Sequence, residues 1–425
     1  MIQSIRGMRD VFPEEARRWR RAEERIRQVL LGHAYEEIQL PLLEATELFS
    51  RGVGEATDIV EKEMYTLADR DGDSISLRPE GTASCVRALQ QHGLLFNQTQ
   101  RVFYAGPMFR YERPQKGRYR QFYQVGAEAF GFPGADVDAE LILMGLDCWR
   151  ALDVAPRVRL EINTLGSSES RRAYRAALVD YLAPLHDELD ADSQRRLSRN
   201  PLRILDSKDP RTQALLVDAP KLPDFVDAEG HAHFRRLCEL LDALRVPYGV
   251  NPGLVRGLDY YTHTVFEWIT DDLGAQGTIC AGGRYDGLVE RLGGRPTPGA
   301  GFAIGLDRVI LLQQALGAGS AGEDFSSGAD VYVCVLDEAH QSWALALAEK
   351  LRERLATFRI RTHAGGGKLK NQMKRAHQSG ARFALVIGED EVRAGRPALK
   401  YLREDRPQES LEIDALVERL RASAG

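Results

Sequence analysis

The chain has 425 residues, of which 43% are hydrophobic and 28% charged, and its formal net charge is −5. These proportions are those of ordinary globular proteins, so they exclude a collagen, a coiled-coil rod and a wholly disordered chain. At about 150 residues per domain, the length predicts two or three domains. The acidic balance argues against a surface that binds nucleic acid everywhere, although local basic patches remain compatible with it.

The cysteine pattern and the N-terminus bear on the compartment. Five scattered cysteines without a Cys-x-x-Cys pair argue against a disulfide framework and a four-cysteine zinc site. The N-terminus lacks the apolar core of a secretory signal, and no run approaches the roughly 18 apolar residues that span a bilayer. We expect a cytoplasmic protein without a membrane segment. His231, His233 and Cys238 come nearest to a metal cluster, but they lie in a helical pattern, and we expect no metal held by protein side chains.

The first predicted element is an amphipathic helix over residues 13–32, beginning at Pro13 and ending at Gly32. An extended stretch interrupted by Pro41 covers residues 35–44. Strand patterns then dominate and crossover helices are few, which favours an antiparallel sheet in an α+β domain. The predicted strands are 64–69, 74–82, 101–112, 119–131, 158–166, 261–269 and 277–283, with a strand running into a helix at 299–316 and helices at 82–92 and 137–152.

Residues 167–247 break this rhythm, because helical segments alternate there with Pro- and Asp-rich breaks. This pattern predicts a helical insertion. A Gly/Ser/Ala-rich linker covers residues 317–328, and strands and helices then alternate as β-α-β-α-β. That alternation predicts a parallel α/β domain. We expect a first domain over 1–325 that includes the insertion, and a second over 329–425.

Two basic segments stand out against the acidic average. The loop 110–122 carries five Lys or Arg residues against one acid, and residues 359–382 carry seven with no acid. Arg forks match phosphate oxygens in pairs, although a solvated hairpin tip and a solvated helix face are the alternatives. Two such segments in one acidic chain favour a nucleic-acid ligand.

Several charged residues lie in apolar or glycine-rich surroundings. Glu128 lies in the apolar run 126–131, so its carboxylate needs either an ion-pair partner or a ligand N–H. Arg256 raises the same question for a cation. Arg308 lies near a predicted helix start, where its charge opposes the helix dipole, so we expect it to face an anion. The sequence has no His-Glu-x-x-His or Walker-type motif, and residues 299–305 lack the spacing of a dinucleotide fingerprint.

Taken together, these segments resemble the bacterial histidyl-tRNA synthetases, a family of class II aminoacyl-tRNA synthetases, over essentially the whole chain. The N-terminal helix with QLPLLE (39–44) is similar to class II motif 1, RYE after Phe109 to motif 2, and GFAIGLDR (301–308) to motif 3. Two blocks are typical of the histidyl enzymes: LVRGLDYY (254–261) and AGGRYDGL (281–288). LRPEGT (77–82) precedes motif 2, as in that family.

The resemblance implies a class II antiparallel sheet with flanking helices, a helical insertion and a C-terminal α/β anticodon-binding domain. It implies that L-histidine reacts with ATP, accompanied by Mg²⁺, to give histidyl-adenylate, and that histidine then passes to the 3′ end of tRNA(His). The family is homodimeric through the motif 1 region, and the insertion is expected to contact the acceptor arm of the tRNA.

The same resemblance assigns residues to each ligand. The implied catalytic residues are Arg110 and Arg256, which flank the α-phosphate. The implied histidine site comprises Glu80, Thr82, Arg110, Gln124, Glu128, Arg256, Tyr260, Tyr261 and Tyr285. The implied ATP site comprises Arg110, Glu112, Arg118, Phe122 and Arg308. The implied tRNA contacts are Arg113, Gln115, Lys368, Lys370, Lys374 and Arg375.

Two other hypotheses compete with this interpretation. One is a non-catalytic relative that regulates a short ATP phosphoribosyltransferase. Such relatives lack the C-terminal domain and some residues of the histidine-specific blocks, whereas this chain keeps Arg256 and Tyr261. The other is a class II synthetase for glycine, threonine or proline, against which the two histidine-specific blocks argue.

Overall fold

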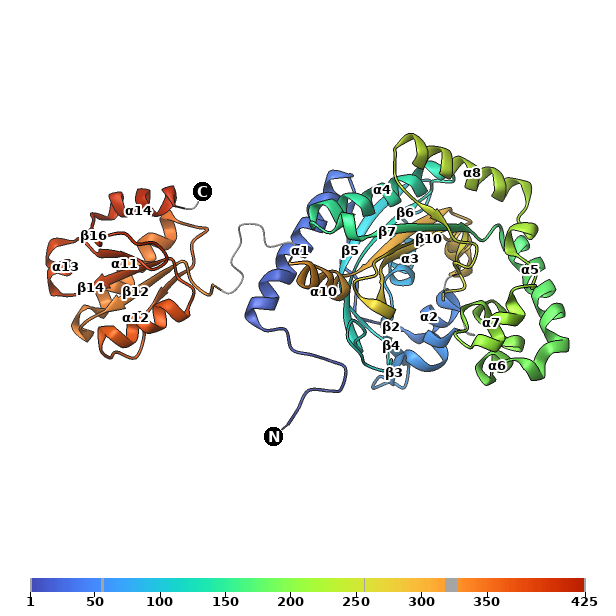
Figure 1. The fold of residues 1–425 in the computed structure, drawn as a ribbon, viewed down its shortest axis with the longest axis horizontal. Coiled ribbons are helices and arrows are strands. Elements are labelled where there is room, and N and C mark those ends of the chain that lie inside the picture. The colour runs from blue at the N-terminus through green and yellow to red at the C-terminus, as the bar shows by residue number, and fades with distance from the viewer. Residues whose placement is uncertain (1, 55–56, 256, 318–326, 424–425) are drawn as a thin grey trace. The chain divides into compact units, whose positions relative to one another are not determined.

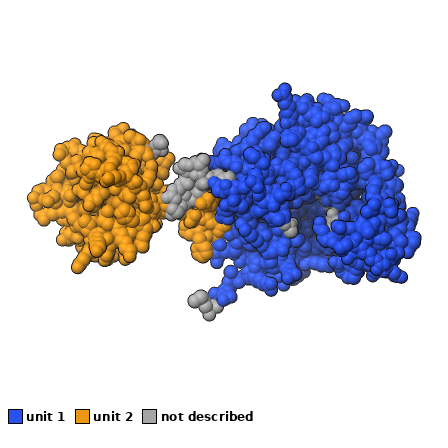
Figure 2. All heavy atoms as spheres, in the orientation of Figure 1, with its two compact units in different colours: residues 1–10, 19–319 blue, residues 11–18, 320–425 orange. Residues whose placement is uncertain are grey.

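The computed structural model describes residues 2–54, 57–255, 257–317 and 327–423. The chain divides into two compact units, residues 1–10 with 19–319 and residues 11–18 with 320–425 (Figure 2). The predicted N-terminal helix is observed as α1 (Pro13–Gly32), which buries Trp19, Ala22, Ile26 and Leu30. None of the described helices is both long and apolar enough to cross a membrane.

An eight-stranded sheet, in the order β1-β5-β6-β11-β10-β9-β7-β8, forms the centre of the first unit (Figure 1). Neighbours from β5 to β7 pair antiparallel, and the edge pairs β1–β5 and β7–β8 are parallel. The predicted antiparallel sheet is confirmed. The strands are β1 (Glu36–Glu37), β5 (Gln100–Phe109), β6 (Gln121–Phe130), β7 (Arg159–Thr164), β8 (Gly249–Val250), β9 (Thr262–Ile269), β10 (Thr278–Arg284) and β11 (Gly299–Gly305).

Helices flank this sheet, and the same unit contains a second, three-stranded sheet. The helices are α2 (Thr46–Val53), α3 (Thr82–Gln91), α4 (Ala135–Ala151), α9 (Leu288–Arg291) and α10 (Leu306–Leu316), with short turns η1 (Ile59–Glu63), η2 (Ala155–Arg157) and η6 (Gly274–Gln276). The strands predicted at 64–69 and 74–82 form the antiparallel pair β3 (Tyr65–Ala68) and β4 (Ser74–Leu77), and β2 (Leu43–Ala45) completes the three-stranded sheet.

The strand register separates the two faces of the large sheet. Glu128 of β6 is paired with Gly301 of β11, and the register continues across β10 to Val265 of β9. Paired residues point to the same face, so Val265 shares a face with Glu128. Trp268 comes three residues later and points to the opposite face, where it meets Trp149 of α4 with ring centroids 6.2 Å apart. The Glu128 face carries α3, whose Thr82 hydroxyl donates to Glu128.

The segment predicted as an insertion is helical in the structure. It contains α5 (Ser168–Leu182), α6 (Ala191–Arg199), α7 (Pro210–Leu216) and α8 (Ala228–Ala243), with short turns η3 (Ala183–Glu188), η4 (Pro201–Asp206) and η5 (Leu222–Phe225). Ser167, Asp190, Asp209 and Asp227 are the N-caps, and each side chain accepts a backbone N–H of the first turn. The aspartates of the predicted breaks therefore start helices.

The second unit contains a five-stranded sheet in the order β13-β12-β14-β15-β16. The parallel part was predicted, and it comprises β12 (Val331–Val335), β13 (Ile360–Thr362), β14 (Phe383–Ile387), α11 (Gln341–Arg354) and α12 (Leu369–Gln378). The prediction of a purely parallel sheet is wrong at one edge, because β15 (Ala398–Tyr401) and β16 (Glu409–Ser410) pair antiparallel. With four and two residues, these strands are too short to give an alternating hydrophobic pattern. The turn η7 (Glu338–His340) and the helices α13 (Glu389–Ala394) and α14 (Ile413–Ala422) complete this unit.

Candidate active site

A cavity of about 320 Å³ lies on the Glu128 face of the large sheet. Motif 2, the strand β6 and the histidine-specific blocks all contribute to its walls. The predicted histidine and ATP residues that line it are Glu80, Thr82, Arg110, Glu112, Arg118, Phe122, Gln124, Tyr260, Tyr261, Tyr285 and Arg308. Residues spread over more than 200 positions of sequence are thus brought to one cavity.

A buried carboxylate, Glu128, lies at one end of this cavity, where it accepts hydrogen bonds from the lining residues Thr82, Tyr104 and Tyr285 and is not itself part of the lining. Glu128 is 1% exposed. Its Oε1 accepts the hydroxyl of Thr82 at 2.7 Å and that of Tyr104 at 3.0 Å, and its Oε2 accepts the hydroxyl of Tyr285 in a short hydrogen bond. Burial raises the pKa of Glu128 to about 8, although the hydrogen bonds from Tyr285 and Thr82 oppose that rise. The partners of this carboxylate among the described residues are therefore hydroxyl groups, and not the cation of the predicted ion pair.

A second buried carboxylate, Glu80, lies at the start of α3. Its two oxygens accept the backbone N–H groups of Thr82 at 2.7 Å and Ala83 at 2.9 Å. Burial raises the pKa of Glu80, while these two backbone hydrogen bonds lower it. An anion at a helix start is stabilised by the unpaired N–H groups there. The helix therefore holds Glu80 in place at the cavity wall.

Three tyrosines, Tyr260, Tyr261 and Tyr285, form an aromatic wall next to Glu128. Their ring centroids are separated by 4.7 Å (Tyr260–Tyr261), 5.5 Å (Tyr260–Tyr285) and 6.3 Å (Tyr261–Tyr285). Gly301 of β11 lies directly across from Glu128, and a Cβ added there would lie 1.8 Å from Glu128 Oε2. The backbone of β11 therefore sets the position of the carboxylate.

The other end of the cavity carries arginines on the motif 2 loop. The Arg110 guanidinium lies 5.2 Å from the centre of the Phe122 ring, and its Nε donates to the carbonyl of Pro79 at 2.9 Å. Glu112 forms an ion pair with Arg118, and its Oε1 lies 3.9 Å from Arg110 Nη1. This end combines an aromatic face, a carboxylate and several cations, which are the groups that bind a nucleotide.

Arg308 of α10 was predicted to face an anion. Within the protein it donates instead to neutral oxygens: Nε to the carbonyl of Gly117 at 3.1 Å, Nη1 to that of Thr278 at 2.6 Å and Nη2 to Gln276 Oε1 at 2.9 Å. It thereby holds the motif 2 loop against β10. Burial, together with Arg118 and Arg110, lowers the pKa of Arg308 to about 10. An anion placed among these three cations would relieve their repulsion.

Sequence reasoning missed Tyr104, which lines the cavity and donates to Glu128. Tyr104 is paired with Gly126 across β5 and β6. A Cβ at Gly126 would lie 2.3 Å from the Tyr104 ring, and a Cβ at Gly81 would lie 2.2 Å from it. The only signals in the sequence were these two glycines, which leave space for a ring that the strand pairing brings there.

The remaining predicted residues lie elsewhere or outside the described residues. Arg113 and Gln115 are exposed on the motif 2 loop, and Lys368, Lys370, Lys374 and Arg375 are exposed in or beside α12. Arg256 lies outside the described residues. His233, noted in the sequence as part of a possible metal cluster, instead lies 2.7 Å from Asp138 through its Nε2.

Comparison with known proteins is decisive at this point. The family described as "Histidyl-tRNA synthetase" matches residues 7–309, and "Anticodon binding domain" matches residues 330–423. The chain belongs to the histidyl-tRNA synthetase family. It is therefore a histidine–tRNA ligase with ATP as a substrate. An anticodon-binding domain is what the resemblance to the synthetases implied for this part of the chain.

Solved structures agree with this assignment. The apo histidyl-tRNA synthetase of S. aureus is 34% identical, with a TM-score of 0.81, and the match covers 99% of this chain and 100% of that one. The histidyl-tRNA synthetase of Nostoc is 20% identical with a TM-score of 0.71 and full coverage of both chains, which shows a shared fold. A Bacillus halodurans protein described as an ATP phosphoribosyltransferase regulatory subunit/histidyl-tRNA synthetase is 22% identical, with a TM-score of 0.63, over 88% of this chain and 96% of that one. At that identity it shows the fold and does not distinguish the two activities.

Proposed function

We propose that histidine and ATP occupy the two ends of this one cavity and react where the ends meet. The observation that carries this proposal is the continuity of the cavity, which joins the Glu128 end to the arginine end. A histidine carboxylate oxygen attacks the α-phosphorus, an O–P bond forms, and pyrophosphate leaves with its bonding electrons. The protein's contribution is to hold the reactants in line and to stabilise the negative charge on the phosphate oxygens.

Arg110 stands at the junction of the two ends. Its Nε donates a hydrogen bond to the carbonyl of Pro79, the residue before Glu80, while its guanidinium lies near the Phe122 ring. We assign Arg110 to the α-phosphate for this reason. Arg256 is assigned to the same phosphate from the family resemblance alone.

The remaining groups of the arginine end position the nucleotide. Phe122 and Arg308 are placed on either side of the adenine, Glu112 accepts from its amino group, and Arg118 with Arg308 neutralises the distal phosphates. Among the described residues no group of three His, Cys, Asp or Glu side chains could hold a metal ion. We therefore propose that Mg²⁺ arrives with ATP, held mainly by phosphate oxygens and water.

The histidine ligand is recognised through its backbone and its ring. Within the described part of the chain, Gln124 Oε1 is buried without a hydrogen-bond partner, so it is available to the α-ammonium together with Glu80 and Thr82. Glu128 and Tyr261 are assigned to the imidazole nitrogens, and Tyr260 and Tyr285 form the wall. A wrong side chain would leave these buried polar groups unpaired, which can give about 10⁴-fold discrimination without editing.

Glu128 and the substrate ring share one proton in this proposal. Glu128 has a pKa of about 8, and free imidazole titrates at about 6.5. Between these values the separated pair already holds one proton, so binding needs no net proton exchange. Below pH 6.5 a second proton must be lost, and above pH 8 one must be taken up, so histidine affinity falls about tenfold per pH unit on either side. Calorimetry in buffers of different ionisation enthalpy measures the number of protons exchanged when histidine binds. Release of one proton at pH 7 would contradict the shared proton.

The second step and the domain roles follow from the family. A hydroxyl of the tRNA 3′ ribose attacks the histidyl carbonyl, an ester forms, and AMP leaves. We propose a catalytic domain over 1–325 with its insertion at about 167–247, and an anticodon-binding domain over 329–425. Arg113, Gln115 and the basic residues Lys368, Lys370, Lys374 and Arg375 are proposed phosphate or base contacts, because they are exposed and cationic or amide-bearing.

We also propose a cytoplasmic homodimer. All five cysteines are unpaired, which agrees with a reducing compartment. Leu42, Leu43 and Leu67 in and beside the three-stranded sheet are 42%, 44% and 45% exposed, an apolar surface that a second copy would cover. Light scattering would give twice the chain mass, and Leu43→Asp would reduce it.

The principal test is pyrophosphate exchange with each of the twenty amino acids. Exchange with histidine alone is the expected result. Exchange with another amino acid would overturn the assignment of the Glu128 pocket, and no exchange by folded protein would overturn the proposed chemistry as a whole.

A further inference from the structure

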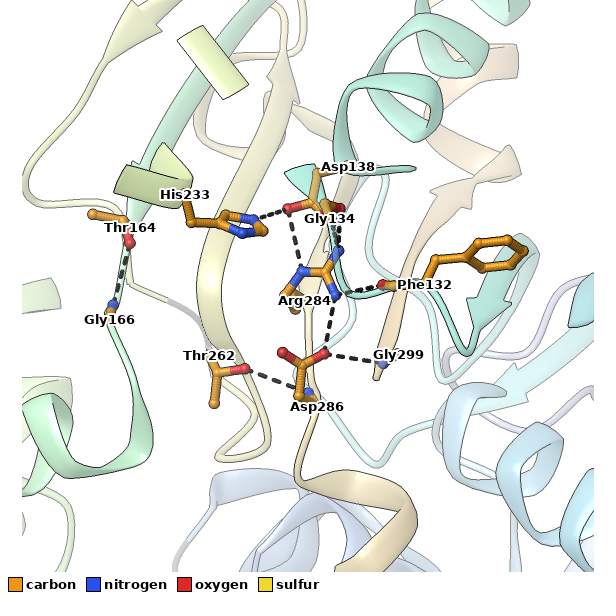
Figure 3. Close-up of polar contacts among 10 residues, drawn as sticks. All are labelled: Phe132, Gly134, Asp138, Thr164, Gly166, His233, Thr262, Arg284, Asp286 and Gly299. Atoms are coloured by element: carbon orange, nitrogen blue, oxygen red, sulfur yellow. Dashed lines mark hydrogen bonds and ion pairs between the residues drawn. The ribbon is translucent and has the colours of Figure 1, made fainter. Parts of the chain in front are cut away.

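A buried ion cluster lies next to the aromatic wall and joins elements far apart in sequence (Figure 3). Arg284, at the end of β10, has a fully buried side chain, and that of Asp138 in α4 is 1% exposed. Arg284 Nη2 donates to Asp138 Oδ1 at 2.6 Å, and Nε lies 3.3 Å from Oδ2. This two-point contact fixes the plane of the guanidinium.

The remaining donors of Arg284 are also engaged. Nη1 donates to the carbonyl of Phe132 at 2.9 Å and to Asp286 Oδ1 at 3.1 Å, and Nη2 donates to the carbonyl of Gly134 at 2.8 Å. Arginine has five N–H donors, and all five of Arg284 are directed to acceptors within the protein, so none remains for a ligand and Arg284 is a structural anchor.

The cluster around Arg284 includes both sequence neighbours of Tyr285, a residue of the proposed histidine pocket. Tyr285 lies between Arg284 and Asp286, and its backbone N–H donates to the Gly299 carbonyl at 2.7 Å. Asp286 Oδ1 in turn accepts the Gly299 N–H at 3.1 Å. A Cβ at Gly299 would lie 2.6 Å from the Tyr285 ring, so the ring rests on the backbone. The residues on both sides of Tyr285 are therefore clamped, and this sets where its hydroxyl meets Glu128.

The outer end of the cluster belongs to the helical insertion. His233 of α8, the last helix of that segment, lies with Nε2 2.7 Å from Asp138 Oδ2, and Figure 3 shows Asp138 between His233 and Arg284. α8 packs directly on α4. Burial tends to raise the pKa of Asp138, but the hydrogen bond from His233 and the charge of Arg284 outweigh it and the pKa is lowered. His233 thus helps to keep Asp138 ionised and in place.

We propose that His233 is a positioning residue for histidine recognition. It holds Asp138, Asp138 holds Arg284, and Arg284 sets the Tyr285 hydroxyl at Glu128. The helical insertion thereby influences affinity for the amino acid through a chain of direct contacts, in addition to any contact with tRNA. This inference rests on the proposed function, since it assumes that the Tyr285–Glu128 pair reads the imidazole.

The test compares three variants of the full-length protein in histidine-dependent pyrophosphate exchange, which needs no tRNA. His233→Leu removes the hydrogen bond, His233→Gln keeps an amide N–H that can donate to Asp138, and His231→Leu alters an exposed residue of the same helix. We expect His233→Leu to raise KM for histidine about tenfold with KM for ATP unchanged, because a buried charged acceptor loses its donor. His233→Gln should restore most of the loss, and His231→Leu should match wild type.

Each outcome is informative. An unchanged histidine KM in His233→Leu, or equal rises for histidine and ATP, would overturn the positioning role while leaving the proposed function intact. Wild-type protein without histidine-dependent exchange would instead overturn the proposed function. If His233→Leu does not fold, as judged by circular dichroism, His233→Asn takes its place, since its shorter amide does not reach Asp138. The proposal would also be contradicted if the histidine KM of His233→Gln were no closer to the wild-type value than that of His233→Asn.

Discussion

The two ends of the cavity are built on opposite principles. At the Glu128 end, a buried carboxylate has its oxygens taken by the hydroxyls of Thr82, Tyr104 and Tyr285, and tyrosine rings surround it. At the arginine end, cations lie near one another on a partly exposed loop, and their repulsion contributes to the lowered pKa of Arg308. The first end is preorganised by its own hydrogen bonds, whereas the cations of the second repel one another, and an anionic ligand would relieve that repulsion.

This difference separates recognition from chemistry. Preorganised buried polar groups give specificity, because a wrong ligand leaves them unpaired. Clustered cations increase the rate of the chemical step, because they stabilise charge that develops on phosphate oxygens. Substitutions at the Glu128 end should therefore act on KM for histidine, and substitutions at the arginine end on the rate of adenylate formation.

The largest effect is expected at the arginine end. Arg110→Gln should reduce histidine-dependent pyrophosphate exchange by about 10³-fold, because a charge-stabilising donor is removed from the α-phosphate. Arg113→Gln, an exposed change on the same loop, is the control and should leave exchange unchanged. Equal losses in both variants would show that the loop as a whole, and not Arg110, is responsible.

The next effect tests the Glu128 end. In Gly301→Ala the new Cβ would lie 1.8 Å from Glu128 Oε2, so the carboxylate must move. KM for histidine should rise about 10²-fold while KM for ATP stays the same, since the buried hydrogen bonds of Glu128 are lost. Gly305→Ala on the same strand is the matched control, because its nearest neighbour would be 3.7 Å away. A similar loss in the control would indicate damage to β11 in general.

A smaller effect is expected where neither end is involved. Reversing the charges of Lys370 and Lys374, both exposed on α12, should raise KM for tRNA about tenfold and reduce its salt dependence, because phosphate contacts are lost. Pyrophosphate exchange should not change. Steady-state charging measured at two salt concentrations checks this, and a loss of exchange would contradict separate roles for the two units.

The smallest effect concerns stability. Burial raises the pKa of Glu128 from an ordinary 4.5 to about 8. Between these values the folded protein binds more protons at this site than the unfolded chain, so stability from Glu128 is present at low pH and is lost as pH rises through 8. The amide of Glu128→Gln stays neutral at every pH. The melting temperature of this variant relative to wild type should therefore rise by a few degrees between pH 5 and pH 8. A difference that is constant with pH would show that Glu128 is not held protonated.

Much of the fold was readable along the chain because local physical signals mark it. Proline and glycine at its ends and an apolar stripe predicted α1 with its observed bounds. The strands that pair as β3–β4 and β5–β6 were predicted at 64–69, 74–82, 101–112 and 119–131. The short strands β15 and β16 were missed because runs of four and two residues are too short to show a period.

The residue types of the candidate site were also determined by the sequence, through motifs most of whose described members line one cavity. What only the tertiary structure decided is how they meet. Thr82 and Tyr285 lie 46 and 157 positions from Glu128, and the strand order β6-β11-β10 and the start of α3 bring them to its carboxylate. His233 likewise reaches Asp138 from 95 positions away. Such partners are chosen by strand pairing and helix packing, which local sequence patterns do not encode.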